Sequence, residues 1–333
     1  MQASPMRRRR LRAWGLLAGA LLLALAALAS LALGSRPVPL AVTLDALQAV
    51  DPHDDRHLVV RELRLPRTLV ALLAGALMQA LTRNPLAEPG LLGINAGAAL
   101  AVIVGVALFD LASMGQYLGC AFLGAGLAGI AVFLLGQARE TGTNPVRLVL
   151  AGAGLSVMLA SLTGIIVLNA PPEVFDRFRH WAAGSLSGSG FALLGWPGLA
   201  IGAGLAAAFA LAARLNALAL GQEIGRALGV DLRLTWLLAC LAVMLLAGAA
   251  TALAGPIAFV GLVAPHLARL LAGPDQRWIL PFSALIAAGL LLGADILGRL
   301  LAAPAEIAAG IVALLLGGPA FIVLVRRFRL SRL

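Results

Sequence analysis

Charge is scarce in this chain. Only 12% of its 333 residues are charged, whereas 61% are hydrophobic. A soluble protein carries charge on about a quarter of its residues. So little polar surface could not cover a globule of this length in water, and a lipid bilayer is the solvent that suits the composition. The composition therefore excludes a soluble domain and predicts an integral membrane protein.

Lysine is absent, and aromatic residues are few. All 25 basic residues are arginines, the formal net charge is +10, and Phe, Trp and Tyr together make up 5% of the chain. The arginines are scattered between apolar runs and lack the clustered basic face that nucleic-acid binding requires. We therefore expect no nucleic-acid partner, and we interpret the arginines as markers of membrane topology.

Residues that carry chemistry are also missing. Cys120 and Cys240 lie in separate apolar runs and in no motif, so they are expected to be small buried side chains. There is no Walker A motif, nucleophile elbow or zinc-type cluster, so we expect no catalytic residue, resident metal or cofactor. His53 and His57 have i, i+4 spacing, but nothing nearby completes a coordination shell, which favours a solvated acidic loop.

What the chain does have is long uncharged runs, and a helix needs about 20 mostly apolar residues to cross a bilayer. The first run follows an arginine cluster but is too long for the apolar part of a signal peptide, so it predicts an uncleaved span. The run 234–268 is too long for one helix and contains Gly255-Pro256, which predicts two spans. The runs are Trp14–Leu33, Leu91–Phe109, Leu111–Ala138, Leu148–Leu168, Phe191–Ala213, Leu234–Ala268 (two spans), Trp278–Ala294 and Ile307–Val325.

A tenth span is predicted over Thr68–Leu81, although this stretch reaches only about 21 Å, short of the roughly 30 Å hydrocarbon core. Arginine clusters stand at both ends of the chain, and such clusters stay in the cytoplasm. Two cytoplasmic ends require an even number of spans. The predicted fold class is therefore an all-α, ten-helix polytopic membrane bundle, with residues 1–333 forming one transmembrane domain between cytoplasmic ends 1–13 and 326–333.

This topology assigns the remaining segments. Residues 35–67 form an outer loop, and residues 169–190 form a second one whose pattern predicts a short surface helix. Arg214–Arg233 is the main inner loop. More arginines then fall inside than outside, as expected for a multi-pass protein of the bacterial plasma (inner) membrane.

The sequence shows no site that would couple transport to an energy source. The carboxylates Asp110, Asp295 and Glu306 lie at span edges, whereas ion-driven transporters usually hold an ionisable group or a broken-helix ion site near the midplane. A transporter of this kind needs a partner that supplies energy. An ATP-independent secondary transporter or channel stays open as an alternative.

Several motifs spread from residue 60 to the end of the chain resemble one family. They are Arg64-Leu-Pro-Arg-Thr68, Asn84–Gly93, Gly225–Gly229, Ala254–Arg269, Ala294-Asp295 with Arg299 and Glu306, and Gly317–Phe321. Together they resemble the FecCD-type permeases, the family of siderophore, haem and cobalamin importers. The resemblance implies ten helices per subunit, two permease subunits (a homo- or heterodimer) around a central pathway, two cytoplasmic ABC ATPase subunits and an extracytoplasmic substrate-binding protein.

The resemblance also implies roles for residues at both ends of the bundle. Arg64, Arg67 and Arg299 match arginines that dock the binding protein, although interfacial snorkelling would also account for them. The segment Glu223, Gly225, Arg226 and Gly229 resembles the loop that couples the permease to its ATPase, and a plain positive-inside loop is the alternative. A tight turn leads into the next span and is formed by Asn84, Pro85, Glu88, Pro89 and Gly90. The role expected for these residues is structural, and a contribution to gating is the alternative.

One departure concerns the second span. Between Arg67 and Asn84 this chain is shorter than the family pattern, in a helix that should pack near the pathway. The expected function is the permease subunit of an ATP-driven importer for iron-siderophore or related metal chelates. An inactive paralogue with a shortened second span is a further alternative, and the sequence does not identify the chelate.

Overall fold

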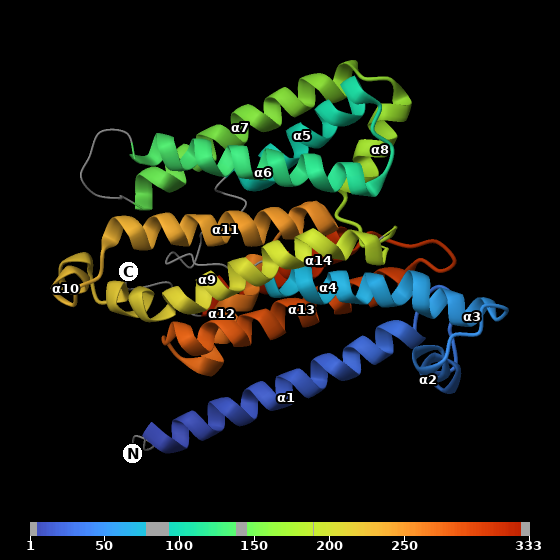
Figure 1. Cartoon of the computed structure of the whole chain (residues 1–333), viewed down its shortest axis with the longest axis horizontal. Helices are drawn as coiled ribbons and strands as arrows, with labels where there is room; N and C mark the ends of the chain where they lie inside the picture. The colour runs from blue at the N-terminus through green and yellow to red at the C-terminus, as the bar shows by residue number, and fades with distance from the viewer. Residues whose placement is uncertain (1–4, 78–92, 138–144, 189, 328–333) are drawn as a thin grey trace.

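The structure is a computed structural model that describes residues 5–77, 93–137, 145–188 and 190–327 (Figure 1). Every regular element in these ranges is helical. Ten of the helices coincide with the ten predicted spans, which confirms the all-α fold class. They are α1 (Pro5–Ala32), α4 (Leu65–Leu77), α5 (Ile94–Phe109), α6 (Met114–Gln137), α7 (Pro145–Asn169), α9 (Gly195–Ala219), α11 (Leu232–Ala254), α12 (Val260–Ala272), α13 (Gln276–Leu301) and α14 (Ala309–Arg327).

Short helices lie at both ends of this bundle. α10 (Gln222–Ala227) lies at the same end as the start of α1, whereas α2 (Leu40–Gln48), α3 (Asp55–Leu58) and α8 (Pro172–Ala182) lie at the opposite end (Figure 1). The helix predicted within 169–190 is thus confirmed as α8. Its Phe178 and Trp181 are buried and its Asp176 and Arg179 are exposed, as expected of a helix that covers the end of a bundle.

The second span is longer than predicted. Helical structure runs without a break through α3, a π-helical segment η1 (Val59–Arg64) and α4. The stretch from Asp55 to Leu77 is therefore about 30 Å long, which is enough to cross a bilayer. The predicted start at Thr68 was wrong, because the charged residues before it belong to the helix. Residues 78–81 lie outside the described residues.

The π-helical segment has a local cause. Pro66 is the second residue of α4, two positions after η1 ends, and proline has no N–H to donate and crowds the carbonyl four residues earlier. A π turn is wider than an α turn and commonly occurs at functional sites. The wide turn before Pro66 lets the helix continue past the proline and sets the direction in which Arg64 and Arg67 point.

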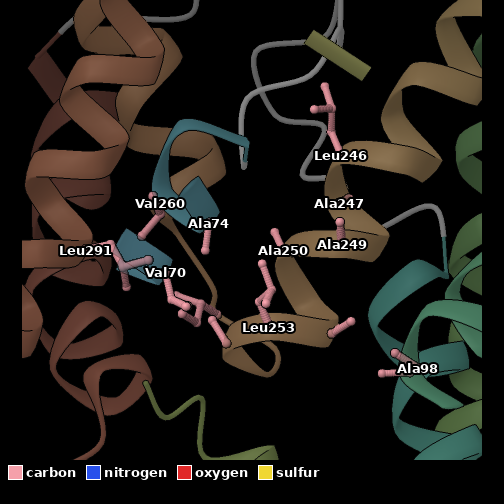
Figure 2. Packing of buried hydrophobic residues seen from close by; sticks show 14 of the residues in the cluster. Val70, Ala74, Ala98, Leu246, Ala247, Ala249, Ala250, Leu253, Val260 and Leu291 are labelled. Atoms are coloured by element: carbon pink, nitrogen blue, oxygen red, sulfur yellow. The ribbon is translucent and has the colours of Figure 1, made fainter. Parts of the chain in front are cut away.

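Helix α11 lies at the centre of the bundle. In its most apolar window 72% of the residues are buried, against 11% for α1 and 6% for α7. Its small side chains allow neighbouring helices to approach closely. Figure 2 shows Ala250 facing Val70 and Ala74 of α4 on one side, while Ala98 of α5 lies on the other. The alanines of α11 therefore pack closely against both neighbours, within a core that also contains large side chains such as Leu253 and Leu291.

The predicted break after α11 is confirmed. Gly255 has φ +73°, and a Cβ atom there would overlap the carbonyl oxygen of Trp181 in α8. Only glycine combines this backbone conformation with so close an approach. Gly310 at the start of α14 donates a hydrogen bond of 2.8 Å to the Gly184 carbonyl. The break therefore brings α11, α8 and α14 together at one end of the bundle.

Candidate functional sites at the two ends of the bundle

The three arginines predicted to dock a binding protein converge at one end of the bundle. Arg64 ends η1, Arg67 lies in the first turn of α4 and Arg299 lies in the last turn of α13. All three are buried, with 6%, 9% and 2% of their surface exposed. Buried guanidinium groups need partners, and the structure supplies two kinds.

The first partner is a carboxylate that sequence reasoning had noted at a span edge and within a family motif, without a role. Asp295 of α13 is fully buried and accepts from Arg67, Nε to Oδ1 at 2.8 Å. Its other oxygen lies 3.0 Å from Nη2 of Arg299, one turn along the same helix. Arg67 also reaches Glu306 through Nη1 at 2.6 Å. An acidic residue four positions before an arginine was the available signal for the Asp295–Arg299 pair.

The second partner is the carboxyl end of α1. The last carbonyl groups of a helix have no N–H donor within the helix, so they can accept hydrogen bonds from other groups. Arg299 donates from Nη1 to the carbonyls of Ser30 and Leu33 at 3.0 Å and from Nη2 to the Ser30 hydroxyl at 2.7 Å. Arg64 donates to the Leu31 carbonyl at 2.7 Å and also to the carbonyl of Arg36. Because the carboxyl end of a helix is the negative end of its dipole, cations are favoured there.

A cavity of about 590 Å³ opens beside this cluster. Its walls include the three arginines and Glu306, and also Arg36 and Arg56, which are exposed. Arg56 donates to Asp54 at 2.7 Å, and this hydrogen bond lowers the pKa of the Asp54 carboxyl to about 2. Since five arginines but only two acids, Asp55 and Glu306, line the cavity, it has an excess of positive charge at the α2–α3 end of the bundle.

The predicted coupling segment lies at the opposite end. Glu223 and Arg226 are exposed on α10, and Gly225 is buried against Leu218 of α9. Gly229 has φ +79°. Its N–H donates to the Arg226 carbonyl at 2.9 Å, and that of Val230 donates to Gly225 at 3.0 Å. These two bonds form a Schellman motif, which explains the glycine at position 229.

The surface of α10 and its flanks is apolar as well as charged. Leu220, Ile224 and Leu228 are 63%, 49% and 61% exposed. Leu220 caps the end of α9, Ile224 lies on α10 and Leu228 caps the end of α10, and Gly221 with φ +119° separates the first from the other two. Sequence reasoning emphasised the glycines and charges of this segment and missed its exposed apolar side chains. The third predicted group, Asn84 to Gly90, lies outside the described residues.

Comparison with known proteins agrees with this architecture. The family model described as the FecCD transport family matches residues 22–327. The chain belongs to this family. The resemblance expected from the motifs is thereby confirmed over nearly the whole chain.

Individual relatives cover this member of the FecCD family almost end to end. The ferric enterobactin transport system permease protein FepD of Escherichia coli is 44% identical, over 92% of this chain and 93% of the relative. The iron(3+)-hydroxamate import system permease protein FhuB of Bacillus subtilis is 40% identical, over 94% and 83%. The hemin transport system permease protein HmuU of Yersinia pestis is 37% identical, over 91% and 93%.

A solved structure has the same fold. It is described as an inward-facing conformation of a metal-chelate type ABC transporter, with a TM-score of 0.81, 29% identity, and coverage of 94% of this chain and 98% of the other. This FecCD family member is therefore a multi-pass membrane permease of the ABC importer type. It is a transport subunit, and ATP hydrolysis belongs to a separate protein.

Proposed function

We propose that this permease forms the membrane pathway through which an ATP-driven importer carries iron-siderophore complexes or a related ferric chelate. The observation that carries this proposal is the full-length similarity to permeases of such systems. The names of these three relatives include ferric enterobactin, iron(3+)-hydroxamate and hemin. We therefore assign the ligand only as a metal chelate and leave its chemical type open.

The proposed assembly uses both ends of the bundle. The α10 end faces the cytoplasm with both termini, in agreement with the arginines at the two ends of the chain. The opposite end, with α2, α3 and α8, faces an extracytoplasmic binding protein. A second permease subunit, identical or related, completes the pathway, and the whole chain acts as one membrane domain.

At the cytoplasmic end, α10 is the proposed contact with the ATPase. Exposed Ile224 and Leu228, with Leu220 at the end of α9, offer apolar surface, and Glu223 and Arg226 offer charge. An apolar centre with a polar rim is the usual composition of a protein interface. The Schellman motif at Gly229 fixes the orientation of this short helix, so a movement of the ATPase would be transmitted directly to α9 and α11.

At the outer end, the cavity beside Arg64, Arg67 and Arg299 is the proposed receptor for an acidic side chain of the binding protein. The cluster has three guanidinium groups and two carboxylates, and therefore an excess of positive charge. The acidic side chain would pass exposed Arg36 and Arg56 at the mouth of the cavity and contact the buried arginines in its wall. Electrostatic complementarity of this kind mainly speeds association and fixes orientation.

The test is reconstitution. The permease is placed in proteoliposomes with its genomically adjacent ATPase, with its binding protein and a radioactive ferric siderophore outside. We expect uptake that requires ATP inside the vesicles and stops when the catalytic glutamate of the ATPase is replaced by glutamine. Uptake by the permease alone would support the secondary transporter instead. Absence of uptake for every ferric chelate offered, despite ATPase binding, would favour the inactive paralogue.

A further inference from the structure

A groove lies between α1 and α13, away from both sites described above. Its volume is about 840 Å³. Three glycines hollow it: Gly15 and Gly19 on α1, and Gly289 on α13. Phe282 and Leu285 form much of its apolar wall. The groove borders α1 along its length from Arg12 to Ala26, about 20 Å, which somewhat exceeds the roughly 15 Å depth of one leaflet.

One end of this groove is cationic. Arg12 lines it, with its guanidinium 5.9 Å from the centre of the Trp278 ring. None of the ion pairs between described residues involves Arg12, whose donors are thus left for another acceptor. Arg9 and Arg10, which precede Arg12, and Arg277, which precedes Trp278, are exposed. Asp275, the N-cap of α13, accepts from the Asn216 amide at 2.7 Å and from the N–H of Arg277 at 3.0 Å.

The position of α1 leaves the groove open to lipid. α1 lies at the edge of the bundle alongside α12 and α13 (Figure 1), and Leu22, which lines the groove, is 66% exposed. Tryptophan and arginine at one end of a span are typical of the interface between hydrocarbon and headgroups. The apolar part of the groove therefore lies at the depth of acyl chains and Arg12 at the depth of phosphates.

We propose that this groove binds an anionic phospholipid, with one acyl chain between α1 and α13 and the headgroup phosphate accepting hydrogen bonds from Arg12. Charge complementarity selects the occupant, because an apolar groove that ends at Arg12 fits a negatively charged headgroup better than a neutral one. Basic pockets between membrane helices are known to hold such headgroups. The bound lipid would attach α1, which packs mainly on α13, to the rest of the permease.

The experiment measures lipid retention by the purified permease–ATPase complex. The complex is delipidated in a neutral detergent, then given equal amounts of phosphatidylglycerol and phosphatidylcholine, and bound lipid is read by native mass spectrometry. We expect preferential retention of phosphatidylglycerol. Arg12→Gln should lower it about fivefold or more, since each arginine near a headgroup contributes about 1 kcal/mol. Arg10→Gln removes the same charge from an exposed position outside the groove and should have a smaller effect.

A second variant tests the acyl-chain part. A Cβ atom at Gly289 would meet only Leu23, at 4.0 Å, so Gly289→Leu can extend into the groove without disturbing the helix. We expect it to reduce retention of phosphatidylglycerol while the melting temperature is kept. Equal losses in the Arg12 and Arg10 variants, equal retention of both lipids, or unchanged retention in Gly289→Leu would each overturn the proposal. So would a bound polypeptide in place of lipid. None of these readouts depends on transport, so they stand apart from the uptake test.

Discussion

Arg67 and Asp295 are 228 positions apart in the chain and form a buried ion pair, with Nη2 2.7 Å from Oδ1. The same carboxylate lies 3.0 Å from Arg299. One buried acid thus balances two buried bases on α4 and α13. Removing a partner from such a group leaves charge uncompensated in a low-dielectric interior.

Asp295→Asn should therefore destabilise the permease. Loss of this carboxylate leaves Arg67 with only Glu306 and Arg299 with only neutral acceptors, at a cost of about 3–5 kcal/mol. The measurement is thermal unfolding of the purified permease in detergent. Glu306→Gln is the matched control, because Glu306 is 32% exposed and should contribute about 1 kcal/mol or less. Equal losses in the two variants would contradict the central position of Asp295.

The control variant has a second expected effect. Glu306 competes for Nη1 of Arg67, so Glu306→Gln increases the excess positive charge at the outer cavity. Association of an acidic binding protein should become about threefold faster at low salt, and the gain should vanish as salt rises. Surface plasmon resonance across a salt series provides the measurement. A slower association would mean that Glu306, rather than the arginines, makes the docking contact.

Charge reversal at the cavity mouth should act in the opposite direction. Arg56 and Arg36 are exposed, so Arg56→Glu and Arg36→Glu leave the buried cluster intact. Both should slow docking without lowering the melting temperature, and a reversed acid on the binding protein should restore part of the rate. Arg179→Glu on exposed α8, outside this cavity, is the comparison. If the docking rate is unchanged in both Arg56→Glu and Arg36→Glu, the cavity does not receive the binding protein.

The loop after α10 offers a test of coupling. Gly229 has φ +79° with no atom within 4 Å of an added Cβ, so substitutions there act through backbone strain alone. Gly229→Val should cost about 1–3 kcal/mol locally and lower ATPase stimulation, whereas Gly229→Asn should retain most of it because asparagine tolerates this conformation. The readout is ATP hydrolysis stimulated by the binding protein. Normal stimulation in the valine variant would contradict the coupling assignment.

Cysteine labelling tests the second crossing. In a background with Cys120→Ala and Cys240→Ala, Arg56→Cys should react with an impermeant maleimide added to spheroplasts. Arg83→Cys should react only after permeabilisation, since the ten-span topology assigns position 83 to the inside. Labelling of both from one face would show that this helix does not cross.

Much of the fold could be predicted from hydrophobicity alone. A span is defined by a local property, the length of an uncharged run, and for this reason nine spans and the break at Gly255-Pro256 were found, whereas the tenth needed the arginine clusters at the two ends of the chain. The second span was found with the wrong start, because Arg61, Glu62, Arg64 and Arg67 resemble a loop when counted locally. The partner of Arg64 is the end of α1 and that of Arg67 is Asp295, and no local pattern reveals contacts over such separations.

The candidate sites likewise combine features that local patterns reveal with contacts between distant segments that they do not. The family motifs indicated Arg64, Arg67 and Arg299 as a set, and the structure brings them together. Their burial could not be predicted, since it depends on the carbonyl groups of Ser30, Leu31 and Leu33 in another helix. The groove beside Arg12 was missed altogether, because a cavity is made by the space between helices rather than by any one segment.

The shared carboxylate of Asp295 has a consequence for motion. Through Arg67, Arg299 and Glu306 it joins the outer ends of α1, α4 and α13 to the loop that leads into α14. Four spans held by one ionic network should translate as a rigid block, because separating them would expose unpaired charge. Movement at this end of the bundle is then expected to come from displacement of α5, α6 and α7 relative to that block. Distance measurements by double electron–electron resonance should find constant spacing within the block and changing spacing across its boundary.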